Sequence, residues 1–122
     1  MTDVIRKSVQ KQLNNHDFTC DKELTLSMFS GKYKMAILIS LYDKNHMHFS
    51  ELQTSLPEAT KQVLSQQLKE LVQDELIVKA EYYANNRRRT RYTLTNIGAS
   101  LIPIFISMQN WGKNYITQHF IA

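Results

Sequence analysis

The chain has 122 residues, 43% of them hydrophobic, which is enough for one hydrophobic core and predicts a single domain over residues 1–122. No apolar run approaches the length of about 20 residues that spans a membrane, and the first residues lack the apolar core of a secretory signal. The formal net charge of +4 favours an anionic partner. Because the single cysteine, Cys20, excludes an intrachain disulfide, we expect a reducing, cytoplasmic location.

The N-terminal segment 3–16 has a narrow apolar stripe. Ile5, Val9 and Leu13 recur at four-residue spacing, and Lys, Arg, Gln and Asn fill most of the other positions. This pattern predicts a helix that lies on the domain surface or against a partner chain.

Three short apolar segments follow. Residues 22–29 fit either a strand or a short helix, and we favour the helix, with its end at Ser30 and Gly31. Residues 32–42 are apolar almost all round, which is typical of a central, buried helix. Residues 47–49 are compatible with one short strand.

The next segment predicts a helix-turn-helix. Ser50 and Gln53 have the spacing of a capping box, which would begin a short helix. That helix should end near Pro57, because the residue before a proline avoids the α conformation. Thr60 is then the expected N-cap of a second helix. Two helices joined by a tight turn match the geometry of this DNA-binding motif.

The second helix has two different faces. Leu64, Leu68 and Leu71 form one apolar stripe, and no acidic residue occurs between positions 60 and 69. Lysine can bind phosphate or guanine, glutamine can pair with adenine, and serine can donate or accept. The alternative is an ordinary amphipathic helix with a solvated polar face. The residues predicted to contact DNA are Thr60, Lys61, Gln62, Ser65, Gln66 and Lys69.

A β-hairpin should follow this helix directly. Residues 76–83 and 90–94 are rich in β-branched and aromatic residues, and the segment 84–86 is turn-like. The position after a helix-turn-helix is that of a wing, and arginine is the residue that enters narrow minor grooves. An isolated basic turn can also be merely solvated. Alternate residues of an extended arm share a face, so three of the four candidate arginines should act together and Arg88 should point the other way. The candidates are Arg87, Arg88, Arg89 and Arg91.

The C-terminal segment predicts one long helix over 96–120, with Thr95 as its cap and a kink at Pro103. Its apolar face is too broad for a small domain to cover. Together with the stripe at 3–16 it predicts a homodimer, although packing within one protomer is the alternative. The face consists of Leu101, Ile104, Phe105, Met108, Trp111, Tyr115 and Ile116.

The sequence contains no motif for phosphate binding, dinucleotide binding or zinc hydrolysis. One cysteine cannot form a multi-thiolate zinc site. The four histidines, at positions 16, 46, 48 and 119, have no convincing partners in the sequence, although His46 and His48 could share one strand face. We therefore expect no enzymatic activity, no metal and no cofactor.

Several local strings together resemble the HxlR family of bacterial winged helix-turn-helix regulators, relatives of the MarR group. They extend from Cys20 to about Trp111, roughly three quarters of the chain. Each string is weak alone, but their combination is specific. The sequence departs from the usual family pattern at Asp21 (usually Pro), Ser30 (Gly), Tyr33 (Trp) and Ala59-Thr60 (Ile-Ser). The matching strings are Gly31-Lys32-Tyr33, Phe49-Ser50-Glu51-Leu52, Val63-Leu64-Ser65-Gln66-Gln67-Leu68-Lys69-Glu70-Leu71, Tyr92-Thr93-Leu94-Thr95 with Gly98, and Leu101 with Pro103 before Trp111.

The resemblance implies a homodimeric, cytoplasmic regulator that binds double-stranded DNA at an inverted-repeat operator. The fold expected is mainly α with a small β-hairpin, in which residues 47–94 form the helix-turn-helix and wing, and the helices at 3–16 and 96–120 form the dimer. Two other readings stay open. One is a MarR-like regulator that senses a small ligand at the dimer interface, and the other is a winged helix that binds protein.

Cys20 is the candidate sensor of an electrophile or oxidant, as some members of the family sense such compounds through an N-terminal cysteine. A thiol just before a helix is favoured as thiolate; Lys22 would help this and Asp21 would oppose it. The alternative is a buried, inert cysteine that acts as a small hydrophobe.

Overall fold

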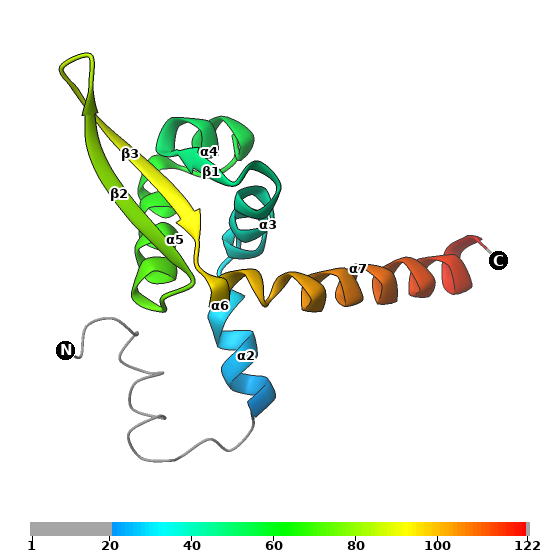
Figure 1. Cartoon of the computed structure of the whole chain (residues 1–122). Coiled ribbons are helices and arrows are strands. Elements are labelled where there is room, and N and C mark those ends of the chain that lie inside the picture. The colour runs from blue at the N-terminus through cyan, green and yellow to red at the C-terminus, as the bar shows by residue number, and fades with distance from the viewer. Residues whose placement is uncertain (1–20, 122) are drawn as a thin grey trace.

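The computed structural model describes residues 21–121 of the chain. Its helices and strands surround one hydrophobic core, and a hairpin and a helix leave this core in different directions (Figure 1). The elements are α2 (Asp21–Phe29), α3 (Lys34–Lys44), β1 (His46–His48), α4 (Phe49–Ser55), α5 (Lys61–Gln73), β2 (Ile77–Ala84), β3 (Arg87–Leu94), α6 (Asn96–Ala99), α7 (Ile102–Ile116) and a π-helical turn (Thr117–Ile121).

The core lies where α3, α4 and α5 meet the base of the sheet. The leucines predicted to form the inner stripe of the second helix, Leu64, Leu68 and Leu71, are all buried on α5. They pack in one cluster with Leu38 of α3 and Leu52 of α4. The predicted arrangement, mainly α with a small hairpin behind a helix-turn-helix, is confirmed.

The sheet has the strand order β1-β3-β2, and all its pairs are antiparallel. The hairpin is longer than predicted, because β3 already begins at Arg87. Only Asn85 and Asn86 form the turn, with φ of 55° and 63°. Two successive residues with positive φ give the turn whose twist matches that of the flanking strands, and asparagine tolerates this conformation.

The expected N-cap of α4 at Ser50 is wrong. The helix begins two residues earlier, and His48 is its N-cap. The Oε1 atom of Glu51 accepts a hydrogen bond of 2.8 Å from the backbone N–H of His48, and the imidazole Nδ1 lies 2.9 Å from the same oxygen. The capping box therefore exists, but it uses His48 and Glu51 instead of Ser50 and Gln53.

The segment 32–42, predicted as a central, buried helix, is buried on one side only. The helix α3 begins at Lys34, and Ile37, Leu38 and Leu41 are buried as predicted. Ile39 is exposed, because it lies on the side of α3 that faces the groove beside α7.

One continuous C-terminal helix was also a wrong expectation. Thr95 is an N-cap, as predicted, but it caps the short helix α6, which ends at Ala99. Pro103 stands in the first turn of α7, where its missing N–H costs nothing, so it begins a new helix instead of kinking an old one. Phe105 is buried against Phe29 with ring centroids 4.9 Å apart, and this contact joins the start of α7 to the core.

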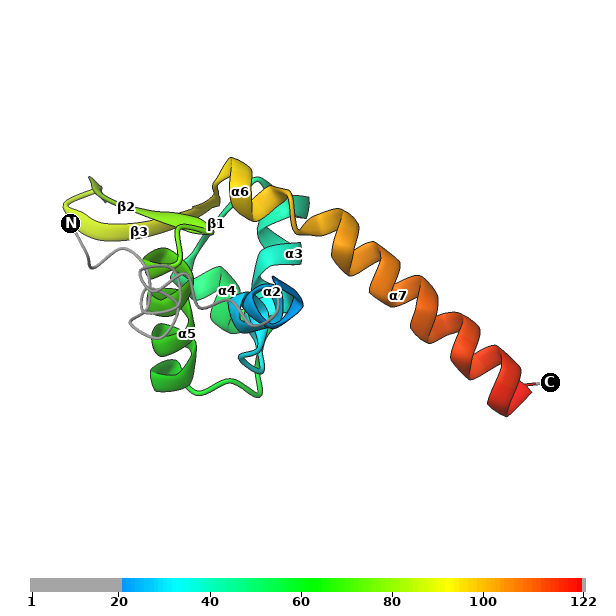
Figure 2. The same ribbon diagram turned by 90° about the horizontal axis from the view of Figure 1, so that it is seen from below.

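The C-terminal part of α7 extends away from the rest of the structure, and the view in Figure 2 shows the same separation. Most of its predicted apolar face is exposed, and Trp111 is 69% exposed. Trp111 stacks on Tyr115, which stacks on His119, with ring centroids 5.3 and 4.0 Å apart. No helix within residues 21–121 is long and apolar enough to cross a membrane. The predicted helix at 3–16 lies outside the described residues.

Candidate nucleic-acid interface

Helix α5 presents the predicted polar face to solvent. Thr60 caps its N-terminus, since the threonine Oγ1 accepts a hydrogen bond of 3.1 Å from the N–H of Val63. The leucine stripe holds the opposite face in the core, which fixes the rotation of the helix about its axis. All the predicted contact residues of this segment are exposed, namely Thr60, Lys61, Gln62, Ser65, Gln66 and Lys69.

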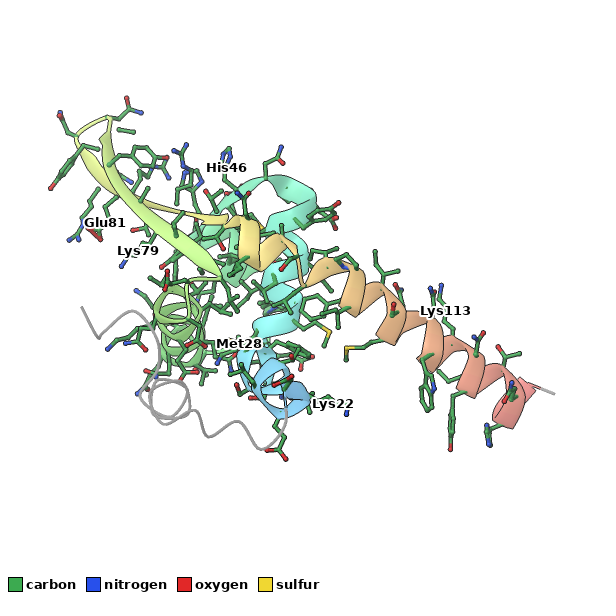
Figure 3. The ribbon with its side chains drawn as sticks, turned by 60° about the horizontal axis from the view of Figure 1, so that its bottom comes forward. Lys22, Met28, His46, Lys79, Glu81 and Lys113 are labelled. Atoms are coloured by element: carbon green, nitrogen blue, oxygen red, sulfur yellow. The ribbon has the colours of Figure 1, made fainter. Side chains whose placement is uncertain are left out.

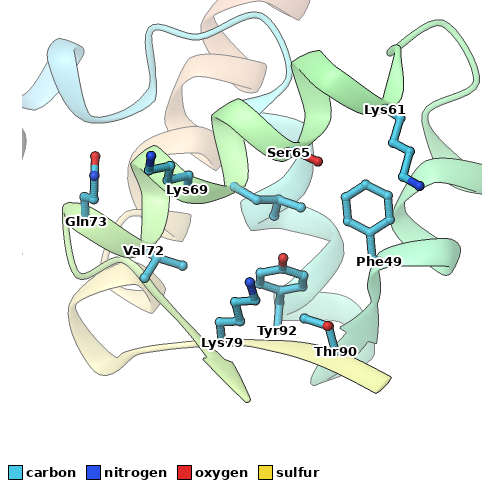
Figure 4. A pocket seen from close by; sticks show the side chains of 10 residues that line it. Phe49, Lys61, Ser65, Lys69, Val72, Gln73, Lys79, Thr90 and Tyr92 are labelled. Carbon is cyan, nitrogen blue, oxygen red and sulfur yellow. The ribbon is translucent and has the colours of Figure 1, made fainter. Parts of the chain in front are cut away.

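A groove of about 620 Å³ separates α5 from the hairpin (Figure 4). Lys61, Ser65 and Lys69 line its α5 side, at the four-residue spacing that aligns side chains along a helix. Lys79 of β2 and Thr90 of β3 line the opposite side. The residues that line this groove therefore supply three ammonium groups and one hydroxyl from each side. Next to them, the carboxylate of Glu81 lies 3.6 Å from the ammonium of Lys79.

The floor of the groove is apolar. It is formed by Phe49, Leu68, Val72 and the ring of Tyr92. Tyr92 is buried, and this burial raises the pKa of its phenol above the ordinary value of 10.0. Because side chains of both α5 and β3 pack in this floor, it fixes the spacing between α5 and the wing and so the separation of the lysines on the two sides of the groove.

The four arginines of the wing divide between its two faces, as the alternation predicted. Arg88 lies on the same face as Glu81, whose carboxylate accepts from the guanidinium at 2.5 Å through both oxygens. The Arg88 hydrogen bond lowers the pKa of Glu81, and the same bond raises the pKa of Arg88. Arg87 and Arg89 are exposed on the other face and, within the described residues, have no acidic partner.

Arg91 lies on this second face too, and its guanidinium carbon is 5.6 Å from the centre of the Tyr82 ring. The Tyr82 hydroxyl is 2.5 Å from His48 Nε2. The expectation that the histidines have no partners is therefore wrong for His48, which joins the wing to the first turn of α4. Glu51 completes this group, and its pKa is lowered chiefly by the hydrogen bond from the His48 backbone N–H. His46 shares the sheet face with His48, on the side away from Lys79 and Glu81 (Figure 3).

Sequence reasoning missed Lys79 and Thr90 as members of the groove. The alternation of side chains along the two strands of the hairpin could have placed both residues on the face that lines the groove. Once Asn85 and Asn86 form a two-residue turn, Lys79 pairs with Tyr92, and Thr90 lies two residues from Tyr92 on the same face. The sequence analysis placed residues 84–86 in the turn, and a three-residue turn gives a different pairing of the two strands.

Cys20 is outside the described residues. Among residues 21–121, no group of three or more His, Cys, Asp and Glu side chains is arranged to hold a metal ion.

The comparisons with known proteins find helix-turn-helix transcriptional regulators. The family description HxlR-like helix-turn-helix matches residues 28–120. The chain is 40% identical over 90 residues to the uncharacterised HTH-type transcriptional regulator YdzF of Bacillus subtilis, which covers 74% of this chain and 82% of that protein. The redox regulator HypR in its oxidised form is a similar solved structure, with 30% identity, a TM-score of 0.70, and coverage of 78% of this chain and 96% of that one. The reduced form of the transcriptional regulator YodB from B. subtilis has 27% identity and a TM-score of 0.69, and covers 84% and 96% of the two chains.

Proposed function

The chain belongs to the HxlR family of helix-turn-helix transcriptional regulators, and from this membership we propose that it binds an inverted-repeat operator as a homodimer. The observation that carries the DNA-binding mode is the groove between α5 and the wing. Lysines from both elements line its rim, so one DNA backbone can meet charges from both. Helix α5 enters the major groove, and the wing lies on the adjacent minor groove.

We assign different roles to the two kinds of side chain on α5. Gln62, Ser65 and Gln66 read base edges, because amide and hydroxyl groups can donate and accept together. Lys61 and Lys69 hold phosphates, as point charges do. Thr60 accepts from Val63 N–H and keeps its hydroxyl proton, which it can donate to a phosphate oxygen.

In the wing, Arg87, Arg89 and Arg91 contact the minor groove or its flanking phosphates from the hairpin face opposite the one that holds Lys79 and Thr90. Arg88 contributes less, because Glu81 already neutralises it. The strand register and the Arg88–Glu81 ion pair support this division, and a direct comparison of single alanine variants tests it.

The dimer proposal rests on α7. A soluble protomer seldom leaves a row of large apolar side chains in water, and α7 exposes Ile104, Met108, Trp111 and Ile116 beyond the core. A two-fold pairing of α7, with the stripe at 3–16 beside it, sets the recognition helices about 34 Å apart or at a multiple of this distance. Residues 1–122 then form one domain with 47–94 as its DNA-reading part.

We further propose that oxidation or alkylation of Cys20 controls binding. Cys20 directly precedes α2 in sequence, where the helix dipole favours thiolate, and similar structures include the redox regulator HypR. Because the chain has one cysteine, a disulfide at Cys20 must join it to a small thiol or to Cys20 of another subunit.

A second mode of control has its own support. A groove of about 550 Å³ between α3 and α7 is lined mainly by apolar side chains, among them Met35, Ile39 and Ile106. A small apolar ligand there would alter the angle at which α7 leaves the core, and Cys20 would be inert.

Selection of bound sequences from random duplex DNA, with and without a disulfide reagent, tests these proposals. We expect a pseudo-palindromic site. Gln62→Ala and Gln66→Ala should each flatten the preference at one position per half-site, by about 5- to 150-fold if a bidentate pair is lost. Cys20→Ser should abolish any effect of the reagent. Failure to bind duplex DNA at low salt would favour a protein-binding winged helix.

A further inference from the structure

A buried lysine connects the core to the recognition helix. Lys34, in the first turn of α3, is 1% exposed, although a lysine is almost never buried unless it is paired. Its Nζ lies 2.6 Å from Oε1 of Glu70 on α5. Gly31 leaves room for this side chain, because a Cβ at that position would lie 3.0 Å from both Cδ and Cε of Lys34.

The second oxygen of Glu70 continues the connection outward. Glu70 Oε2 accepts a hydrogen bond of 3.1 Å from Nε2 of Gln66, one helical turn earlier. An ionised carboxylate can only accept, so the amide nitrogen of Gln66 has to be the atom that faces it. The amide oxygen and the second N–H of Gln66 remain available to a partner in solvent. Their direction is set by the hydrogen bond from Gln66 to Glu70.

The position of α5 against α3 does not depend only on the contacts from Lys34 through Glu70 to Gln66. Gln67 Oε1 accepts a hydrogen bond of 2.8 Å from the backbone N–H of Tyr33, at the same boundary between α3 and α5. The buried leucines of α5 hold it as well. The Lys34–Glu70 pair can therefore be replaced while the helix keeps its place, which separates a positioning role from a structural one.

We propose that Lys34 is a positioning residue for base recognition, which acts through Glu70 to fix the rotamer and the amide direction of Gln66. This inference rests on the proposed function, in which Gln66 reads a base edge. Adenine needs both an acceptor and a donor from one amide, so the direction of the amide decides which base is preferred. A preset side chain also avoids the entropy that a free glutamine loses on binding.

The test replaces both charges by apolar groups of similar size, Lys34→Met with Glu70→Leu, so that no buried charge is left unpaired. We expect a folded protein whose affinity for random DNA and salt dependence equal those of the parent. Its preference at the Gln66 position should fall about three- to tenfold, the loss expected for one unfixed long side chain. In a Gln66→Ala background the double replacement should have no further effect.

Glu70→Gln supplies a second readout. It removes the countercharge of Lys34, so circular dichroism first checks that this variant folds, but the new carbonyl can still accept from Lys34 Nζ. The new NH2 then faces Gln66 and turns that amide round. If neither variant folds, Lys34 and Glu70 are structural residues and the inference is wrong. The outward NH2 then favours a base with acceptors only, such as guanine, and the preference should change instead of flattening. If Gln66→Ala itself leaves the preference intact, the reader role and the inference both fail. If Gln66→Ala flattens it and the Lys34 and Glu70 variants do not change it, the inference alone is wrong.

Discussion

The junction between α6 and the wing depends on one glycine. Gly98 lies under the backbone carbonyl of Leu76, and a Cβ added at Gly98 would stand 2.1 Å from that oxygen. A carbon–oxygen contact needs about 3.3 Å, so Gly98→Ala must separate α6 from the start of β2 by about 1 Å.

The magnitude follows from what holds this junction together. The Leu76 carbonyl accepts a hydrogen bond of 3.1 Å from the backbone N–H of Thr95. The single hydroxyl proton of Thr95 is donated chiefly to the Glu75 carbonyl at 2.7 Å, with the Leu76 carbonyl at 3.1 Å as the weaker second acceptor. Loss of the N–H bond costs about 1 kcal/mol and overpacking adds about 1–3 kcal/mol, which together give about 2–4 kcal/mol. We therefore expect Gly98→Ala to lower the free energy of unfolding by about 3 kcal/mol and Tm by about 10 °C.

Thermal and urea unfolding monitored by circular dichroism measure this effect. Gly112→Ala is the matched control, because it makes the same change in α7, where an added Cβ meets nothing within 4 Å. A glycine in a helix interior is less favourable than alanine by about 1 kcal/mol, so this control should be slightly stabilising. A Gly98→Ala protein that melts within about 3 °C of the parent would refute the reasoning.

Four further outcomes are expected. Lys61→Ala should weaken binding to all duplex sequences alike and reduce the slope of log affinity against log salt by about one, which a salt titration measures. Arg89→Ala should weaken DNA binding more than Arg88→Ala, and equal losses in a gel shift would contradict the division of the wing faces. Trp111→Lys should raise the dimer dissociation constant about 30-fold or more in sedimentation experiments. A parent protein that is monomeric at micromolar concentration would refute the proposed dimer. Because the pKa of Glu81 is lowered in the folded chain, its ion pair stabilises above about pH 4.5 and is lost as the pH falls through the folded value, so Glu81→Gln should show a shallower acid-induced loss of stability.

The features that sequence predicted well depend on neighbours along the chain. The inner face of α5 follows from leucines at helical spacing, and Thr60 caps it through a hydrogen bond that spans three residues. The alternation of Arg88 and Arg89 follows from the pleat of any strand. Local geometry decides these features, so a sequence pattern is sufficient to find them.

The features that sequence missed depend on residues far apart in the chain. Lys34 and Glu70 are 36 positions apart, and His48 and Tyr82 are 34 apart, so no local pattern joins them. Ser50 has good capping chemistry, but β1 ends at His48 and the helix has to begin there. Tertiary contacts overrode a reasonable local preference in this case.

The projecting helix α7 has a consequence for how operator occupancy depends on the amount of this regulator in the cell. If an operator is occupied only by protomers paired through α7, occupancy below the dimer dissociation constant rises with the square of protomer concentration, so doubling synthesis raises it about fourfold. In that case apolar side chains such as Trp111 and Ile116, which are largely exposed in a lone protomer, would set the expression level at which a gene responds. Substitutions in α7 would shift this threshold while leaving the sequence that α5 reads unchanged.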